Sequence, residues 1–404
     1  MTTTSTSPNW LSARREQAAA ALDAIELPRF RGVAGWEFTP IDKLDLDAYP
    51  AAPGGEGGAL FSFDDAVLPS EDAHEVEGPI VMPLALAAER HPDLVAEHLG
   101  TVVTQRTPFT ARNDALWSDG AFVYVPRNMA VDAPIVLNTL HEQSGTTLHW
   151  RVLVVLEEGA DAEVWHESRS ASDDAEGILN GVVELVVGQN ARLRFVDAQD
   201  VAEKSWVFGA QRATVARDGS LDWITLGFGS ANGKVFQETR LAGPGAHGKV
   251  TGAYASRGRQ HLDFDTLQEH AAEDTTSDLA FRGILADRSS AVWRGMIKVD
   301  PGAQRTDAFQ ESRNLLLSKR AHADAIPGLE ILANDVRCTH AAAIAQIDRE
   351  QLFYLRSHGL PETDANRLVI EGFLQALVER FEAGAVRERV AGAIERRLET
   401  VLGR

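Results

Sequence analysis

The sequence predicts a mainly β protein with helical flanks, whose core is a solenoid of stacked strand coils. From about Ala121 the chain consists of short, alternating runs rich in Val, Ile, Leu and Phe, among them FVYV, WRVLVVL and GVVELVV. Each run has about the length of a typical strand of 5 or 6 residues. No helical segment of about 10 to 15 residues separates these runs, which disfavours a doubly wound α/β sheet.

A recurring glycine turn indicates the period of the solenoid. Glycine follows one apolar run and precedes the next at Gly159, Gly188, Gly219, Gly245 and Gly302. The separations are 29, 31, 26 and 57 residues, and the last is close to two steps of the same length. Strands and turns repeating at this period indicate a β-helix. An antiparallel β-sandwich, whose hairpin turns recur every 8 to 12 residues or roughly so, remains the alternative.

The N-terminal region, residues 1–115, is expected to be mostly helical. Apolar residues recur at near-helical spacing within residues 8–25 and again within residues 81–104. The segment Ala51–Gly58, AAPGGEGG, is rich in glycine and proline and therefore predicts a connector. Residues 116–350 then form the β-helix core.

The C-terminal region, residues 351–404, is also predicted to be helical. Two amphipathic segments follow each other, and Gly384 between them is a plausible helix stop. We expect a helical hairpin that projects from the end of the β core, with an apolar surface buried on the core or on a partner. The apolar positions of its first helix include Leu368, Phe373, Leu377 and Phe381.

Composition restricts the classes of partner and the compartment. No apolar run approaches the roughly 18 residues of a membrane span, and the polar start MTTTSTSPNW lacks the pattern of a signal peptide. A cytoplasmic protein is therefore expected. The formal net charge of −20 would repel nucleic acid and anionic lipid surfaces, so neither is an expected partner. A single cysteine excludes an internal disulfide framework.

Two motifs resemble a nucleotide-binding loop and a metal-binding or proton-handling cluster, but structural roles explain both of them better. The stretch GFGSANGKV, residues 227–235, lacks the first glycine and the Ser or Thr of a phosphate loop, so we do not expect nucleotide hydrolysis. HLDFD would place His261, Asp263 and Asp265 on one face of a strand, as a hard-metal or proton-handling cluster. A solvated polar face is the favoured interpretation. A polysaccharide hydrolase or lyase on a β-helix would depend on this one cluster.

Cys338 and His340 form the most unusual pair, because Cys338 is the only cysteine of the chain. Strand alternation would point both side chains the same way, which suits joint metal ligation, a nucleophile pair or simple packing. On spacing alone, structural burial is favoured, since a free cysteine is among the most buried residue types. Iron–sulfur clusters usually take four protein ligands, so a ligand role would require the remaining ligands from another chain.

Three long stretches resemble the SufB/SufD family of iron–sulfur cluster assembly proteins. They are residues 113–137 (NDALWSDGAFVYVPRNMAVDAPIVL), residues 275–318, which include FRGILADRSSAVWRGMIKVDPGAQRTDAFQESRNLLLS, and residues 327–360, which include DVRCTHAAAIAQIDREQLFYLRSHGL. The similarity extends over roughly residues 105–381. The N-terminal GWEFTPIDKL is similar to an element of the SufD branch, and the lack of further cysteines also favours that branch.

The resemblance implies a right-handed parallel β-helix and a non-catalytic subunit of the SufBCD scaffold, which supports iron entry and nascent cluster formation. Its implied partners are SufB, bound through the end of the β-helix, and the SufC ATPase, bound by the C-terminal helices through Leu368, Phe373, Leu377 and Phe381. SufC would also account for the missing phosphate loop.

The Cys-x-His of the family corresponds to Cys338 and His340, with His340 the first candidate ligand of a transient cluster or iron at the SufB interface. No cofactor is expected to bind the isolated chain tightly, and flavin binding is left open. The alternative is a SufB-like homodimeric scaffold, in which two Cys338/His340 pairs meet across a twofold axis.

Overall fold

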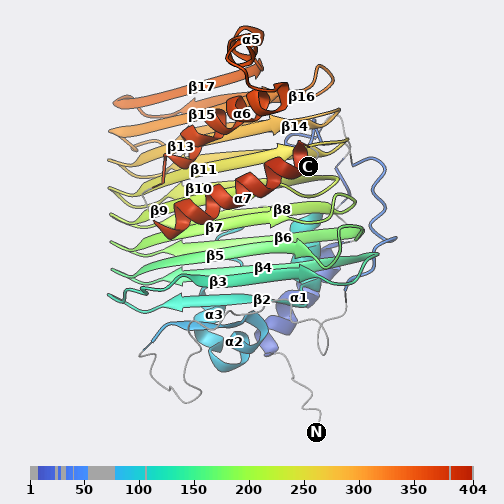
Figure 1. The fold of residues 1–404 in the computed structure, drawn as a ribbon. Helices are drawn as coiled ribbons and strands as arrows, with labels where there is room; N and C mark the ends of the chain where they lie inside the picture. Colours follow the sequence, from blue (N-terminus) through green and yellow to red (C-terminus); the bar gives the residue numbers. More distant parts are fainter. Residues whose placement is uncertain are drawn as a thin grey trace.

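The core of the protein is a β-solenoid built from two parallel sheets (Figure 1). The computed structural model describes residues 8–22, 26–28, 33–39, 41–52, 78–104, 107–381 and 384–402. Sheet A has the order β1-β2-β4-β6-β8-β10-β12-β14-β16, and sheet B has the order β17-β15-β13-β11-β9-β7-β5-β3. The chain thus alternates between the sheets, and each coil adds one strand to both.

The strands of sheet A are β1 (Ile80–Pro83), β2 (Asp119–Val125), β4 (Thr146–Leu156), β6 (Gly177–Val187), β8 (Trp206–Val215), β10 (Asn232–Leu241), β12 (His261–His270), β14 (Ser290–Val299) and β16 (His322–Ile331). The strands of sheet B are β3 (Ile135–His141), β5 (Asp161–Ser170), β7 (Arg192–Asp200), β9 (Ser220–Gly227), β11 (His247–Ser256), β13 (Thr276–Leu285), β15 (Thr306–Leu316) and β17 (Val336–Gln346).

Strand alternation fills the interior of the solenoid. Inward side chains of both sheets form one apolar core, which contains the buried rings of Phe195, Trp223, Phe281 and Trp293. Every pair from β2 to β17 is parallel and joins strands two apart in the sequence. The predicted parallel solenoid is therefore confirmed, and the β-sandwich alternative is wrong because its neighbouring strands would pair antiparallel.

One corner of the solenoid repeats a left-handed backbone conformation once per coil. The residues there have φ between 53° and 73° and are Asn128, Gly159, Asn190, Asp218, Gly245, Asp274 and Arg305. The N–H of Gly159 donates to Gln189 O at 2.8 Å, and the N–H of Asn190 donates to Arg217 O at 2.9 Å, so each coil is tied to the next. Asn and Asp tolerate this conformation, which is why glycine marks only some of the turns.

Helices and the short strand β1 cover the first coils. They are α1 (Asn9–Leu22), α2 (Leu84–Arg90), α3 (Pro92–His98) and α4 (Pro108–Leu116), and Figure 1 shows α1, α2 and α3 at the β2 end. The prediction of helical structure over residues 81–104 is wrong at its start, since Ile80–Pro83 pairs antiparallel with the edge of β2. Residues 33–52 form turns where they are described. Most of the predicted connector Ala51–Gly58 lies outside the described residues.

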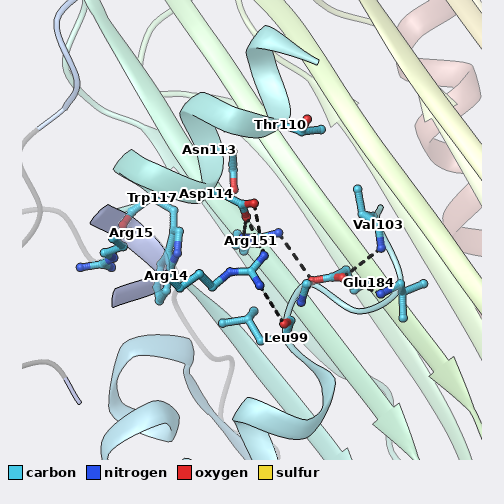
Figure 2. A network of polar contacts seen from close by, with 12 residues as sticks. Arg14, Arg15, Leu99, Val103, Thr110, Asn113, Asp114, Trp117, Arg151 and Glu184 are labelled. Atoms are coloured by element: carbon cyan, nitrogen blue, oxygen red, sulfur yellow. Dashed lines mark hydrogen bonds and ion pairs between the residues drawn. The ribbon is translucent and has the colours of Figure 1, made fainter. Parts of the chain in front are cut away.

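A polar network fixes these helices to the outer face of sheet A (Figure 2). Arg151 of β4 is buried and pairs with Asp114 of α4, which also binds Arg14 of α1 at 3.1 Å. Glu184 of β6 lies 3.6 Å from Arg151 and accepts the N–H groups of the loop that follows α3, including Val103 at 3.0 Å. Its buried carboxylate is thus satisfied by the segment that it holds.

The C-terminal helices are α5 (Arg349–Ser357), α6 (Glu362–Val378) and α7 (Ala385–Val401). Figure 1 shows α6 and α7 crossing the face of sheet B, with α5 beyond β17. Apolar residues of α6 and α7, such as Ile370 and Val390, pack on Ile224 and Ala253 of the sheet. The hairpin therefore lies back along the solenoid. The expectation that it projects from the end of the core is wrong. Among the helices of the described ranges, none is both long and apolar enough to cross a membrane.

Candidate functional site

Cys338 and His340 lie on β17, the last strand of sheet B. The register pairs Cys338 with Ala308 and His340 with Gln310 of β15. Ala308 and Gln310 are buried inside the coil, and Gln310 Nε2 donates across it to Gly295 O at 3.2 Å. In-register stacking therefore places Cys338 and His340 on the interior face, so the predicted common face is confirmed.

The two side chains differ in burial. Cys338 is half-buried and packs on a small cluster that contains Val299 and Ala308, whereas His340 is exposed. Desolvation, together with the carboxylate of Asp307, raises the pKa of the Cys338 thiol. The fraction of reactive thiolate at neutral pH is therefore small, which disfavours an activated nucleophile in the isolated chain.

The solenoid is open at the end where this pair lies. Leu329 and Ile331 of β16 stack on Ile297 and Val299, which are fully buried. No further coil among the described residues lies above them, and Leu329 is 37%, Ile331 40% and Ile344 on β17 46% exposed. Within the same part of the chain, no strand pairs with the outer edge of β16 or of β17. An uncovered core and two free edges are features typical of an association surface.

The opposite end of the solenoid is covered. Leu84, Ala87 and Val95 of α2 and α3 are fully buried against Phe122 and other residues of the first coils. Strand β1 pairs antiparallel with β2 and occupies its edge. The two ends of the solenoid therefore differ: the β2 end is covered, and the β16/β17 end is uncovered by the described residues.

Sequence reasoning did not identify the apolar residues of the open end. Leu329, Ile331 and Ile344 alternate as core residues do, and nothing in their local pattern distinguishes an end strand from an internal one. The available signal was position, because these are the last strand runs before the helical period begins. Leu332, 52% exposed just after β16, belongs to the same group.

The HLDFD stretch forms ion pairs beneath the N-terminal segment. Asp263 accepts from Lys234 Nζ at 2.8 Å and from the hydroxyl of Thr39, and Asp265 pairs with Arg294. His261 is bound to a serine hydroxyl at 2.8 Å. The three residues share the outer face of β12, but the expected solvated face is wrong: residues 33–39 cover it, and Trp36 packs on Phe236 of the neighbouring strand.

The four residues predicted to contact a partner divide into two groups. Leu377 and Phe381 are buried in the cluster that fixes α6 to sheet B. The prediction that these two residues contact a partner is therefore wrong. Leu368 is 49% exposed, and Phe373 is half-buried with the guanidinium of Arg282 over its ring at 5.1 Å.

Leu368 and Phe373 border a groove between α5, α6 and the end of β17. Helix α5 has no buried residue and presents Phe353, 75% exposed, and Tyr354, 61% exposed, to the same groove. These aromatic residues were not singled out from the sequence, although REQLFYLRS directly follows the last strand. Among the described residues, no group of three or more His, Cys, Asp or Glu side chains could hold a metal ion.

A parallel β-solenoid that is covered at one end, uncovered at the other by the described residues and flanked by an exposed aromatic helix is the class of protein that the fold defines. The chain belongs to the SufBD family: the model for "SUF system FeS cluster assembly, SufBD core domain" matches residues 138–373, and that for the SufBD N-terminal region matches residues 58–137. It is thus a member of a family that acts in iron–sulfur cluster assembly.

Named relatives agree with this membership. The chain is 29% identical to the iron–sulfur cluster assembly protein SufD of Bacillus subtilis, with 97% of this chain and 95% of the relative covered. It is 30% identical to a SufBD family protein of Mycobacterium tuberculosis, over 95% of this chain and 92% of the relative. A SufBD family protein of Mycobacterium leprae is 31% identical over 74% of this chain and 76% of the relative.

Proposed function

We propose that this chain is the non-catalytic, SufD-type subunit of a cytoplasmic SufBCD scaffold. In this proposal it pairs with SufB through the open end of its solenoid and binds the SufC ATPase beside α5. The open end carries the proposal, because it joins an uncovered apolar core to two free strand edges. Family membership supplies the cluster-assembly context.

Pairing with the end of a second β-solenoid would cover both the free strand edges and the exposed apolar residues of the open end. Backbone groups of β16 and β17 would gain hydrogen-bond partners, and Leu329, Ile331 and Ile344 would be removed from water. A solenoid partner suits this surface better than a globular one, since it can continue the same strand spacing and the same interior.

The groove beside α5 supports the SufC part of the proposal. Phe353 and Tyr354 form an exposed aromatic pair on a helix with no buried residue, and Leu368 continues the apolar surface. Exposed aromatic residues of this kind are typical of binding anchors. Because ATP hydrolysis belongs to SufC, this chain would contribute attachment.

His340 and Cys338 would provide part of a ligand set for iron or a nascent cluster, which is the cargo of the complex. An exposed imidazole can bind iron directly, whereas iron must displace a proton from Cys338, whose raised pKa opposes thiolate formation. His340 is therefore the first ligand to test. The remaining ligands would come from SufB, and weakly held ligands suit a cluster that has to leave.

The pairing is tested by Ile344→Asp in the full chain, with Leu116→Asp as the matched control. Leu116 is 38% exposed and lies on α4, which packs on β4 and β6 near the covered end. Capture of SufB should fall at least about tenfold for Ile344→Asp, because a carboxylate would be buried in an apolar interface, and should be unchanged for Leu116→Asp. Equal capture by both variants would reject pairing through this end.

The homodimeric alternative shares the same surface, since a second copy also presents a complementary end. Size-exclusion mass with and without excess SufB separates the two. A homodimer that exchanges into a 1:1 heterodimer supports the proposal, and one that persists in the presence of SufB supports the SufB-like scaffold.

The ligand role is tested by comparing His340→Ala with His322→Ala. His322 is an exposed histidine of the adjacent edge strand β16, bound to Asp324 at 3.2 Å. In an anaerobically reconstituted complex of verified stoichiometry, iron and sulfide content should fall for His340→Ala only. Full cluster content with His340→Ala would remove His340 from the ligand set and leave the pairing proposal intact.

A further inference from the structure

A pocket on the outer face of sheet A takes no part in the proposed assembly. It lies between strands β4 and β6, helix α4 and the N-terminal segment 46–51. Its volume is about 170 Å³, similar to the engineered cavity of about 150 Å³ that binds benzene. Apolar walls come from Leu46, Phe109, Leu116 and Ile178. The pocket therefore has the size and lining for one ring or a branched alkyl group.

His149 provides a hydrogen-bond donor at this pocket. Asn180 Nδ2 lies 3.0 Å from His149 Nδ1 and 2.8 Å from the carbonyl oxygen of Phe109. The carbonyl fixes the amide orientation, so Asn180 donates to Nδ1 and the proton of the neutral ring must sit on Nε2. Burial, with a contribution from the nearby Arg112, lowers the pKa of His149 to about 4. At neutral pH the ring is an uncharged donor whose Nε2–H has no bonding partner among the described residues.

Arg112 provides the positive charge. It lies on α4 and lines the pocket, with about a third of its side chain exposed at 32%. Its one ion pair within the described ranges is with Asp47, a carboxylate at the edge of the same pocket; the distance is 4.0 Å and the Asp47 side chain is 94% exposed, so a bound carboxylate would replace it as the acceptor. A long, solvated ion pair of this kind contributes little free energy, so the Arg112 guanidinium is available to a ligand that accepts at a shorter distance.

We propose that this pocket binds a small monocarboxylate with an apolar body the size of one ring. The carboxylate would accept from the guanidinium of Arg112 and from His149 Nε2–H, while the ring or alkyl group packs on the walls. A guanidinium and an N–H donor suit a carboxylate, and a pocket that combines apolar walls with polar groups able to fix a ligand is typical of ligand sites. This inference does not depend on how the chain pairs with SufB or SufC.

The test uses benzoate as the probe and benzamide as its neutral counterpart, in ligand-observed NMR titrations of the purified full chain. A ligand this small should bind with a Kd of about 1–10 mM. Benzoate should bind at least about fivefold more tightly than benzamide, because only benzoate carries the charge that Arg112 recognises. Absence of saturable benzoate binding, or equal binding of the two probes, would overturn the proposal.

Two variants and a control locate the binding. Arg112→Gln should remove the preference for benzoate, whereas Arg127→Gln, which removes the same charge from an exposed pair with Glu158 at 2.9 Å, should leave it unchanged. Leu116→Trp should block both probes, because a larger side chain at this lining position would fill part of the pocket, and it keeps the proposal testable if Arg112→Gln does not fold. Folding of each variant is checked by circular dichroism. Benzoate affinity that survives both Arg112→Gln and Leu116→Trp would place the binding elsewhere and reject this site.

Discussion

The buried ion pair between Lys234 and Asp263 gives a prediction whose size follows from the structure. The Nζ to Oδ1 distance is 2.8 Å, and the two side chains are 2% and 1% exposed. At an effective dielectric constant of about 20 the attraction is about 6 kcal/mol, much of which is offset by the desolvation of both groups. Lys234→Met keeps most of the apolar stem but leaves Asp263 buried with the hydroxyl of Thr39. We expect a loss of about 3–5 kcal/mol in the free energy of unfolding.

The assay is equilibrium urea unfolding followed by tryptophan fluorescence, with a double variant and a matched control. Lys234→Met combined with Asp263→Leu should recover most of the loss, because no charge is then left buried without a partner. The control is Lys204→Met, which breaks a pair with Asp174 of the same 2.8 Å length whose side chains are 60% and 87% exposed. Its urea midpoint should hardly change.

One result would refute this reasoning, and a second would add a functional role for Asp263. If Lys234→Met costs less than about 1 kcal/mol, water reaches the pair and the covering segment does not exclude it. If the double variant regains stability but loses iron and sulfide in the reconstituted complex, Asp263 has a functional role in addition to its structural one. The second result would restore the cluster interpretation of HLDFD.

Three further predictions concern pH, the solenoid corner and the C-terminal helices. Burial lowers the pKa of His149 and of His270 to about 4. Because both side chains bind protons more readily in the unfolded chain, the free energy of unfolding should fall as the pH drops from about 6.5 toward 4, by up to about 3 kcal/mol for each histidine. His270→Gln should flatten the fall of the urea midpoint, and an unchanged slope would contradict this assignment. Asn190→Ala should cost about 1 kcal/mol in urea unfolding and Asn190→Gly nothing, because φ is 54° there; equal losses would show that the side chain matters more than the backbone. Leu377→Ala should cost about 2–5 kcal/mol, whereas Leu368→Ala should leave stability unchanged and weaken SufC capture, and the reverse pattern would invert their assigned roles.

The coil period illustrates how far local pattern can be read. The glycines at 159 and 245 occupy the left-handed corner position, and the same position in other coils is filled by residues such as Asn190 and Asp218. Gly188 lies elsewhere in the turn, where an added Cβ would come within 2.7 Å of the backbone of the preceding coil. The glycine spacing was therefore visible in the sequence. The reason why each position requires glycine depends on contacts between coils.

The N-terminal region shows where local pattern failed. Residues 80–83 carry an apolar sequence that suits a strand or a helix equally, and the free edge of β2 decides for the strand. The same region supplies Thr39 and Trp36 over β10 and β12, more than 190 residues away. No local pattern in HLDFD could reveal that cover.

The sequence by itself determined the alternating strands, their period, the common face of Cys338 and His340 and, through its long matching stretches, the family. These features depend on backbone geometry within a few residues, or on the order of residues along the chain. Only the tertiary structure decided that Leu377 is buried while Leu368 is exposed, that Asp263 is covered, and that the solenoid is closed at β2 and open at β17. A side chain is buried only where another part of the protein covers it. In each of these cases the covering segment comes from a distant part of the chain, or none of the described residues supplies one.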